Sequence, residues 1–549
     1  MDERDVILDV DVAVDLLADR RPDGPVAKAA VDSVLNGEGR VWLVAASLPV
    51  LIDRLTEAFQ AATGDKEQTL DRDTASSRAR EALRSFLGRA GVLTSHGFDA
   101  EAALETEAPM GTFILRAADA LAGDVAILSR DPGFIATDKK VMAPKDFAER
   151  TDSKDDAGET IPFVDLARQQ RRILTKVEKG ISTVLRHGQY IMGPQIKELE
   201  QKLAEYTGVE HAICCASGTD ALLLALMAYG VGPGDAIFTS PFTFISTAEV
   251  ISLLGATPVF VDIDPWTFNI DPDCLEKAIE ACKAGNPEIY PLPAPLAGSA
   301  KPLKPRGIMP VDLFGLPVDY DRVNAVAAKQ GLFVIEDAAQ SFGAEYHGRR
   351  ACSLGDIGCT SFFPAKPLGC YGDGGAVFTR DGELAERMVS MRVHGKGKDK
   401  YDNSRIGLNA RMDTLQAALL LTKLEIFPEE IVSRNRVAAR YTELLSPHEA
   451  LRTPHVPEGL LSAWAQYSPL TDRREDIQSA LKAKGIPTAV YYPKPLHLQT
   501  AYAGLGYKEG DFPESESTSR RIFSLPMHPY LTESQISMLS EELIRVVEV

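Results

Sequence analysis

The chain has 549 residues, of which 45% are hydrophobic and 25% are charged, and its formal net charge is −19. This length exceeds one compact domain, so we expect about two to four domains of ordinary globular composition. The negative charge makes nucleic acid a poor partner, because it repels a phosphate backbone. No apolar run reaches the roughly 18 residues of a membrane span, and the acidic start MDERDVILDV lacks the basic region of a signal peptide. We therefore expect a cytoplasmic protein without a membrane segment.

Residues 1–150 are typical of a small α/β domain. Strand-like cores occur in DVILDVDVAVDLL, RVWLVAASLPVLI and GDVAILSRD, and a helical stretch, ASSRAREALRSFLGRA, lies among them. Residues 151–160, TDSKDDAGET, are polar and have no apolar period. This segment is therefore a predicted linker.

A different pattern begins at residue 161. Strand-like runs alternate with helical segments: HAICCAS, DAIFTS, TPVFVDI, IMPVDLF, LFVIED, CTSFF and GGAVFT. This alternation predicts a mainly parallel sheet with helices on both faces over residues 161–425. NPEIYPLPAPLAGSAKPLKPRG is a predicted exposed loop, and MDTLQAALLLTKLEIFPEEIVSRNRVAARYTELL is a predicted long helix. It leads into a smaller α+β domain, residues 426–549.

The seven cysteines show no zinc-type spacing, and no His/Cys cluster accompanies them. Buried, reduced thiols of a reducing compartment explain them best. We therefore expect no metal site.

Three features in the second part of the chain carry chemistry. Ser217-Gly218-Thr219 precedes an apolar helix, and a helix N-terminus suits a phosphate. Asp337 ends a buried strand, where ligands of open α/β sheets bind. Lys366 lies in a proline-framed turn after Ser361, and a desolvated neutral lysine can form an imine with an aldehyde. Alone these features could be helix caps and a structural lysine. In this order they suit pyridoxal phosphate.

The chain resembles the sugar-nucleotide aminotransferases of the DegT/DnrJ type, which are fold type I pyridoxal phosphate enzymes. The resemblance runs from about Phe163 to the C-terminus. It is carried by HGQYIMGPQIKELE, SGTDALLLAL, FTFISTAEV, VDIDPWTFNIDP, VIEDAAQSFGA, TSFFPAKPLGCYGDGG, GLNARMDTLQAALL and SLPMHPYL.

The resemblance implies a role for each matching residue. Lys366 would bond covalently to the cofactor and then shuttle the proton, and Asp337 would keep the pyridine nitrogen protonated. The other implied cofactor contacts are Gln340 near the ring hydroxyl, Phe244 on the ring face, Gly218, Thr219 and Ser361 at the phosphate, and Asn409 reaching that phosphate from the neighbouring subunit. A homodimer with shared active sites is therefore implied.

The implied reaction is ping-pong transamination, with glutamate as amino donor and a nucleotide-linked keto-sugar as acceptor. The sequence most resembles the branch that acts on UDP-2-acetamido-2-deoxy-3-oxo-glucuronate. Arg411 would bind the uronate carboxylate as a fork, although an interface arginine is an equal alternative. Tyr492 and His497 are candidate sugar-pocket residues, and His497 could equally be a packed histidine.

Residues 5–147 faintly resemble a PIN domain, the fold of many metal-dependent ribonucleases. Asp9 and Asp131 occupy matching positions, with Asp11 as a possible substitute. Leu51, Gly111 and Thr112 lie where further acids are expected, and two carboxylates hold magnesium weakly. The first domain is therefore predicted to be an inactive PIN-like module used for contact or assembly. An unrelated α/β domain is the alternative.

Two other functions compete with transamination. One is a regulatory protein that binds pyridoxal phosphate without turnover, which intact Lys366, Asp337 and Asn409 argue against. The other is a metal-dependent nuclease, which the net charge and the missing acids disfavour.

Overall fold

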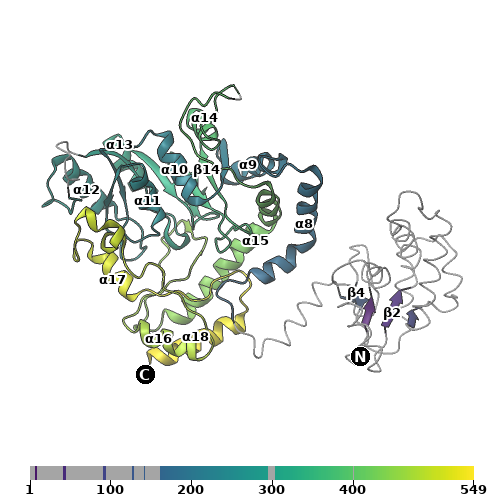
Figure 1. The fold of residues 1–549 in the computed structure, drawn as a ribbon. Helices are drawn as coiled ribbons and strands as arrows, with labels where there is room; N and C mark the ends of the chain where they lie inside the picture. Colours follow the sequence, from purple (N-terminus) through teal and green to yellow (C-terminus); the bar gives the residue numbers. More distant parts are fainter. Residues whose placement is uncertain are drawn as a thin grey trace. The chain divides into compact units, whose positions relative to one another are not determined.

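A computed structural model describes residues 161–294, 303–399 and 401–548, together with five short strands in the first 150 residues. The chain forms two compact units, Met1–Glu159 and Thr160–Val549 (Figure 1). The predicted linker, residues 151–160, lies outside the described residues.

The described strands of the first unit run in parallel. They are β1 (Val6–Leu8), β2 (Val41–Val44) and β3 (Gly91–Leu93) in one sheet, and β4 (Ile127–Leu128) and β5 (Val141–Met142) in another. Parallel neighbours need crossover connections, as in α/β proteins. The predicted strand cores contain β1, β2 and β4. Asp9, Asp11 and Asp131 lie outside the described residues, so the PIN-like interpretation stays a prediction.

The second unit is built on a seven-stranded sheet in the order β6-β14-β13-β10-β9-β7-β8. Its strands are β6 (His211–Cys215), β7 (Asp235–Thr239), β8 (Thr257–Phe260), β9 (Lys304–Ile308), β10 (Phe333–Asp337), β13 (Ile357–Ser361) and β14 (Gly375–Thr379). Only β14 runs antiparallel to its two neighbours in this sheet. The predicted mainly parallel sheet is confirmed.

The remaining elements of the second unit are helices and short strands. The helices are α8 (Leu166–His187), α9 (Pro194–Thr207), α10 (Gly218–Ala228), α11 (Ser246–Leu253), α12 (Pro272–Ala284), α13 (Tyr320–Gln330), α14 (Gly382–Met391), α15 (Thr414–Leu445), α16 (Arg474–Ala483), α17 (Pro513–Arg521) and α18 (Glu533–Val547). Shorter elements are β11 (Glu345–Tyr346), β12 (Arg349–Arg350), β15 (Leu460–Leu461), η2 (Leu313–Gly315), η3 (Leu496–Leu498) and η4 (Thr500–Leu505).

Helices cover both faces of the sheet, as predicted (Figure 1). Ile237, Ile335 and Val377 are buried against α10, α11 and α14. Their chain neighbours Phe238 and Val334 are buried in a different core with α12 and α13. This division follows from the strand geometry, because successive side chains point to opposite faces.

One predicted loop is partly a strand. The proline-rich segment was expected to be a loop, but its last residues form β9 between β10 and β7. Pro305 pairs with Ala236 and Gly307 with Ile237, so Arg306 is an extra residue in a bulge. Proline cannot donate to a sheet, and a bulge is one place where a strand accepts it.

Helix α15 begins and ends close to the predicted limits. It crosses the predicted domain boundary at residue 425, and its first half packs in the core beneath the sheet through Ala417, Leu420 and Phe427. Its second half forms a separate core with α16 and α18, in which Tyr441 is fully buried. One helix thus joins the sheet to the C-terminal part of the chain.

The seven cysteines are all free thiols, and each except Cys274 is buried. In the described part of the chain, no group of three or more His, Cys, Asp or Glu side chains could hold a metal ion. None of the helices described here has both the length and the apolar surface needed to cross a membrane.

Candidate active site

A cavity of about 530 Å³ lies where β10 and β13 end, next to the start of α10. Most of the predicted site residues line it. They are Gly218, Thr219, Phe244, Asp337, Gln340, Ser361, Lys366 and Tyr492. Gly218 and Tyr492, which are 274 positions apart in the chain, therefore meet in one place, as expected for a site at the carboxyl ends of parallel strands.

The start of α10 forms an anion-binding end of this cavity. Ser217 caps the helix, and its Oγ accepts from the Asp220 backbone N–H at 3.0 Å. Thr219 Oγ1 lies 2.9 Å from Ser246 Oγ. A side chain at Gly218 would come within 2.7 Å of Ser361 Cβ, so glycine lets the helix start touch the end of β13. Hydroxyls beside a helix N-terminus suit a phosphate group.

Asp337 is the buried carboxylate of the cavity. It accepts hydrogen bonds from Thr247 Oγ1 at 2.8 Å and from the Ala339 backbone N–H at 3.2 Å. Burial raises the pKa of Asp337, whereas these two hydrogen bonds and the charge of Lys366 lower it. A cationic ring nitrogen at this carboxylate would favour the ionised form further.

Lys366 is the cation of the cavity. Its backbone N–H donates to the Phe363 carbonyl at 2.9 Å, within the tight turn that follows β13. Burial lowers the pKa of Lys366, and the charge of Asp337 opposes this shift. A larger fraction of neutral amine results, and the neutral amine is the form that reacts with an aldehyde.

Aromatic and amide side chains form the remaining wall. Gln340 Nε2 donates to the Tyr492 hydroxyl at 2.7 Å, and Gln340 Oε1 accepts from the Phe314 backbone N–H at 2.5 Å. Tyr492 has φ 57°, an unusual value for a non-glycine residue, and its ring lies 5.7 Å from that of Phe242. Phe244, by contrast, is 60% exposed, so its ring is open to a ligand.

Asn409 and Arg411 do not line this cavity. They line a second cavity of about 460 Å³, and Asp373 belongs to the walls of both. Asn409 is held by a bridge to Val393, and Ile191, which lines the same cavity, is 46% exposed. The two cavities are therefore neighbours, and Asn409 and Lys366 line different ones.

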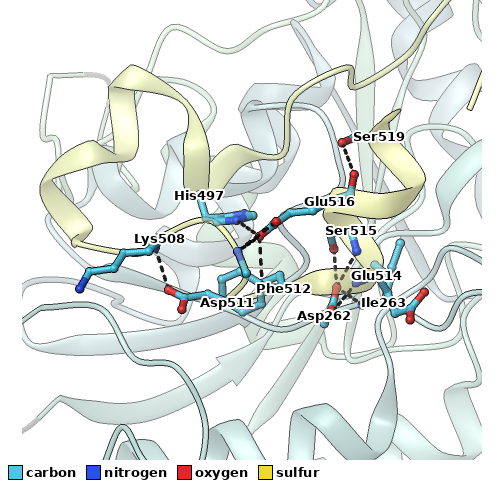
Figure 2. A network of polar contacts seen from close by, with 11 residues as sticks. Asp262, Ile263, His497, Lys508, Asp511, Phe512, Glu514, Ser515, Glu516 and Ser519 are labelled. Atoms are coloured by element: carbon cyan, nitrogen blue, oxygen red, sulfur yellow. Dashed lines mark hydrogen bonds and ion pairs between the residues drawn. The ribbon is translucent and has the colours of Figure 1, made fainter. Parts of the chain in front are cut away.

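The expectation for His497 requires correction, because this residue does not line the cavity. It is 1% exposed, and its Nε2 lies 3.0 Å from Glu516 Oε1 on α17 (Figure 2). Both oxygens of Glu516 also accept from the Gly510 backbone N–H. Burial lowers the pKa of His497, opposed by Glu516. The packed histidine, the alternative stated from the sequence, is what the structure contains.

Several cavity residues were not predicted. They are Thr243, Ser246, Thr247, Phe363, Asp373, Gln466 and Tyr491. Thr247 had a visible signal, because it lies in the first turn of α11, three residues after the predicted Phe244. Gln466 had none, since only the tertiary fold brings its segment to the cavity.

A sequence profile of the DegT/DnrJ/EryC1/StrS aminotransferase family matches residues 172–543. The UDP-2-acetamido-2-deoxy-3-oxo-D-glucuronate aminotransferase of Pseudomonas aeruginosa is 48% identical over 383 residues, which are 70% of this chain and 99% of that protein. A DegT/DnrJ/EryC1/StrS aminotransferase from Brucella abortus superposes with a TM-score of 0.66 at 48% identity, covering 70% of this chain and 98% of that structure.

NtdA from Bacillus subtilis, solved with bound cofactor PMP, superposes with a TM-score of 0.62 at 27% identity. The match covers 71% of this chain and 85% of that one. These similarities confirm the resemblance predicted from the motifs after Phe163. The chain therefore belongs to the DegT/DnrJ/EryC1/StrS aminotransferase family.

Proposed function

We propose that the chain transfers an amino group from glutamate to a UDP-linked 3-oxo sugar of the 2-acetamido-uronate type, with pyridoxal 5′-phosphate as cofactor. The observation that carries this proposal is the meeting of Lys366, Asp337 and the α10 N-terminus in one cavity. We place the reaction in amino-sugar or surface-polysaccharide biosynthesis. The free thiols support a reducing, cytoplasmic location.

The cavity residues fit this cofactor. The α10 start, Thr219 and Ser361 would hold its phosphate, and Asp337 would pair with its ring nitrogen. When bound, pyridoxal phosphate supplies an electron sink for the transfer. Lys366 Nζ would hold the cofactor covalently and would move a proton between the donor and cofactor carbons. Phe244, at the open side, would cover the ring and exclude water.

The sugar assignment rests on similarity and on charge. The curated relative with 48% identity acts, by its name, on a 3-oxo-glucuronate. Arg411 offers a guanidinium that can bind a carboxylate through two parallel hydrogen bonds. Because Arg411 and Asn409 line the second cavity, we propose that each reaches the Lys366 cavity of a neighbouring subunit in a homodimer. Tyr492 is the sugar-pocket residue of the same subunit.

A visible spectrum tests the cofactor lysine. We expect the purified protein with pyridoxal phosphate to show the band of covalently bound cofactor, which glutamate bleaches and the keto-sugar nucleotide restores. Lys366→Ala should lose the band and lower kcat about 10³-fold or more, because covalent catalysis is removed. Lys329→Ala, at a largely exposed lysine paired with Glu276, is the matched control and should behave as wild type.

The substrate is tested with paired acceptors, a UDP-3-oxo uronate and its neutral 6-hydroxyl counterpart. Arg411→Ala should lower kcat/KM for the uronate about 10- to 100-fold and change the neutral acceptor little. Equal losses for both acceptors would contradict the carboxylate assignment.

A band that glutamate leaves unchanged would favour a regulatory protein without turnover. The nuclease alternative concerns residues outside the described ones and is tested with RNA and magnesium.

A further inference from the structure

Lys423 is a buried lysine in the first half of α15, outside the walls of the Lys366 cavity. The residue is 1% exposed. Its Nζ donates to the Gly369 carbonyl at 2.6 Å and lies 4.4 Å from the centre of the Tyr371 ring. Burial lowers the pKa of Lys423 to about 8. Burying an ammonium is costly unless its contacts compensate. These two contacts are therefore what stabilises the Lys423 ammonium in this buried place.

Both contacts fall on the turn that carries Lys366. Within this turn the Lys366 N–H donates to the Phe363 carbonyl at 2.9 Å, and the Cys370 N–H donates to the Phe362 carbonyl at 2.8 Å. A Cβ at Gly369 would lie 2.5 Å from the Pro364 carbonyl oxygen. Gly369 therefore packs directly against Pro364, which lies two positions before Lys366.

Helix α15 holds the end of this turn at two points. Gln416 accepts from the Tyr371 backbone N–H at 2.9 Å and donates to the Tyr371 carbonyl at 3.4 Å. Gln416 and Lys423 are seven residues apart, so they lie on the same face of the helix. Gly369 and Tyr371, in the second half of the turn, are thus attached to a long helix by an ammonium and an amide.

We propose that Lys423 is a positioning residue for Lys366: its ammonium fixes the Gly369 carbonyl and so orients the turn that presents Lys366 to the cofactor. The inference rests on the proposed function, in which Lys366 bonds to the cofactor. Lys423 itself touches neither cofactor nor substrate. Its effect on the reaction comes from geometry, because a displacement of about 1 Å in a reacting group can cost about 100-fold in rate.

The test compares Lys423→Met with Lys176→Met in the full chain. Lys176→Met makes the same substitution at an exposed site. Lys176 lies on α8, and its Nζ pairs with Glu425 of α15 at 2.5 Å. In protein depleted of cofactor, Lys423→Met should raise amide hydrogen exchange about 10-fold in the peptide 362–372 and leave other peptides of the second unit unchanged. With cofactor, kcat should fall about 10- to 100-fold, while KM for glutamate changes less than about 3-fold.

Borohydride reduction separates this inference from the proposed function. If the wild-type protein carries no reduced cofactor on Lys366, the proposed function fails. If the wild type is labelled there but Lys423→Met matches Lys176→Met in exchange, labelling and kcat, only the positioning inference fails. Lys423→Gln, which keeps an N–H donor, should recover part of the exchange protection and of kcat. If Lys423→Met does not fold, Lys423→Gln takes its place in the comparison with Lys176→Met.

Discussion

At the scale of single residues, the state of Asp337 decides how well the cavity can hold a cationic ring. Burial favours the neutral acid, and the hydrogen bond from Thr247 Oγ1 favours the carboxylate. A hydrogen bond to a charged group contributes about 1.5–3 kcal/mol. Thr247, which was not predicted, is therefore a support for the predicted carboxylate.

Removing this hydroxyl should raise the pKa of Asp337. We predict that Thr247→Val lowers kcat/KM about 10-fold at the acidic end of the pH range, because a smaller fraction of Asp337 is ionised there. The acidic limb of the pH–rate profile should move to higher pH, and the loss should shrink as pH rises. A pH series of kcat/KM measures this.

Thr239→Val provides the matched control for Thr247→Val. Thr239 is equally buried, but its Oγ1 donates to the Met309 carbonyl at 2.8 Å and not to Asp337. This variant should lose stability without moving the acidic limb. An unchanged limb in Thr247→Val would contradict the proposed support of Asp337.

The sequence allowed most cavity residues to be predicted because strand ends and helix starts are local patterns. Asp337 ends an apolar run, and Gly218 and Thr219 begin one. His497 has no such pattern around it. Its partner Glu516 lies on another element, and their buried pairing arises only when both segments pack on the large core. A histidine's role in a loop could not be decided without that contact.

At the scale of elements, a pair of buried carboxyl groups joins the segment before η2 to β10. Asp312 accepts hydrogen bonds from Tyr320 and Ser341 at 2.9 and 2.7 Å, and Glu336 accepts from the Cys352 backbone N–H at 2.5 Å. Both are fully buried, and burial raises the pKa of each, to about 7 for Asp312. Two adjacent carboxyl groups in such a place retain a proton between them.

This retained proton makes stability depend on pH. In the unfolded chain such carboxyl groups ionise near pH 4. Between about pH 4 and 7 the folded protein therefore binds more protons, so the pair contributes most to stability at the acidic end and loses that contribution as pH rises to 7. We predict that Asp312→Asn weakens this loss, because the substitution removes the carboxyl group whose pKa burial raises to about 7.

Urea denaturation at several pH values measures the effect. The unfolding free energy of Asp312→Asn relative to wild type should rise by roughly 1–3 kcal/mol between pH 4 and 7. Asp319→Asn, at the exposed N-cap of α13, keeps a good capping residue and should show no such trend. Parallel pH curves for Asp312→Asn and wild type would contradict the shared proton.

Elements with a clear apolar period were predicted well. Strand β9 has no such period, so apolar periodicity could not predict it. Its sequence, KPRGI, has one apolar side chain besides proline, and a proline argues against a central strand. The strand exists because β7 and β10 flank it and a bulge accommodates Pro305. The KPRGI segment has a low local preference for a central strand, and pairing with β7 and β10 overrides this preference.

At the scale of the whole molecule, the two neighbouring cavities raise the question of which subunit completes which site. Asp373 contributes to both cavities, whereas Asn409 and Arg411 contribute only to the second. The predicted homodimer resolves this arrangement if Asn409 and Arg411 of one subunit serve Lys366 of the other. Closed two-fold symmetry would then produce two equivalent sites.

Complementation between two inactive variants tests this arrangement. Lys366→Ala removes the cofactor lysine, and the double variant Asn409→Ala/Arg411→Ala removes the residues expected to reach the partner's site. Each homodimer should lose at least about 90% of wild-type activity. After denaturation and refolding together in equal amounts, about half of the dimers should be mixed.

A mixed dimer would hold one site with Lys366 from the double variant and with Asn409 and Arg411 from the Lys366→Ala subunit. The mixture should therefore recover about a quarter of wild-type activity. If all three residues act within one subunit, every site in every dimer carries at least one substitution and no activity returns. Mixing the folded homodimers without denaturation is the control, because recovery requires exchange of subunits. The measured activity thus distinguishes sites shared between subunits from sites contained in one, independently of which sugar is aminated.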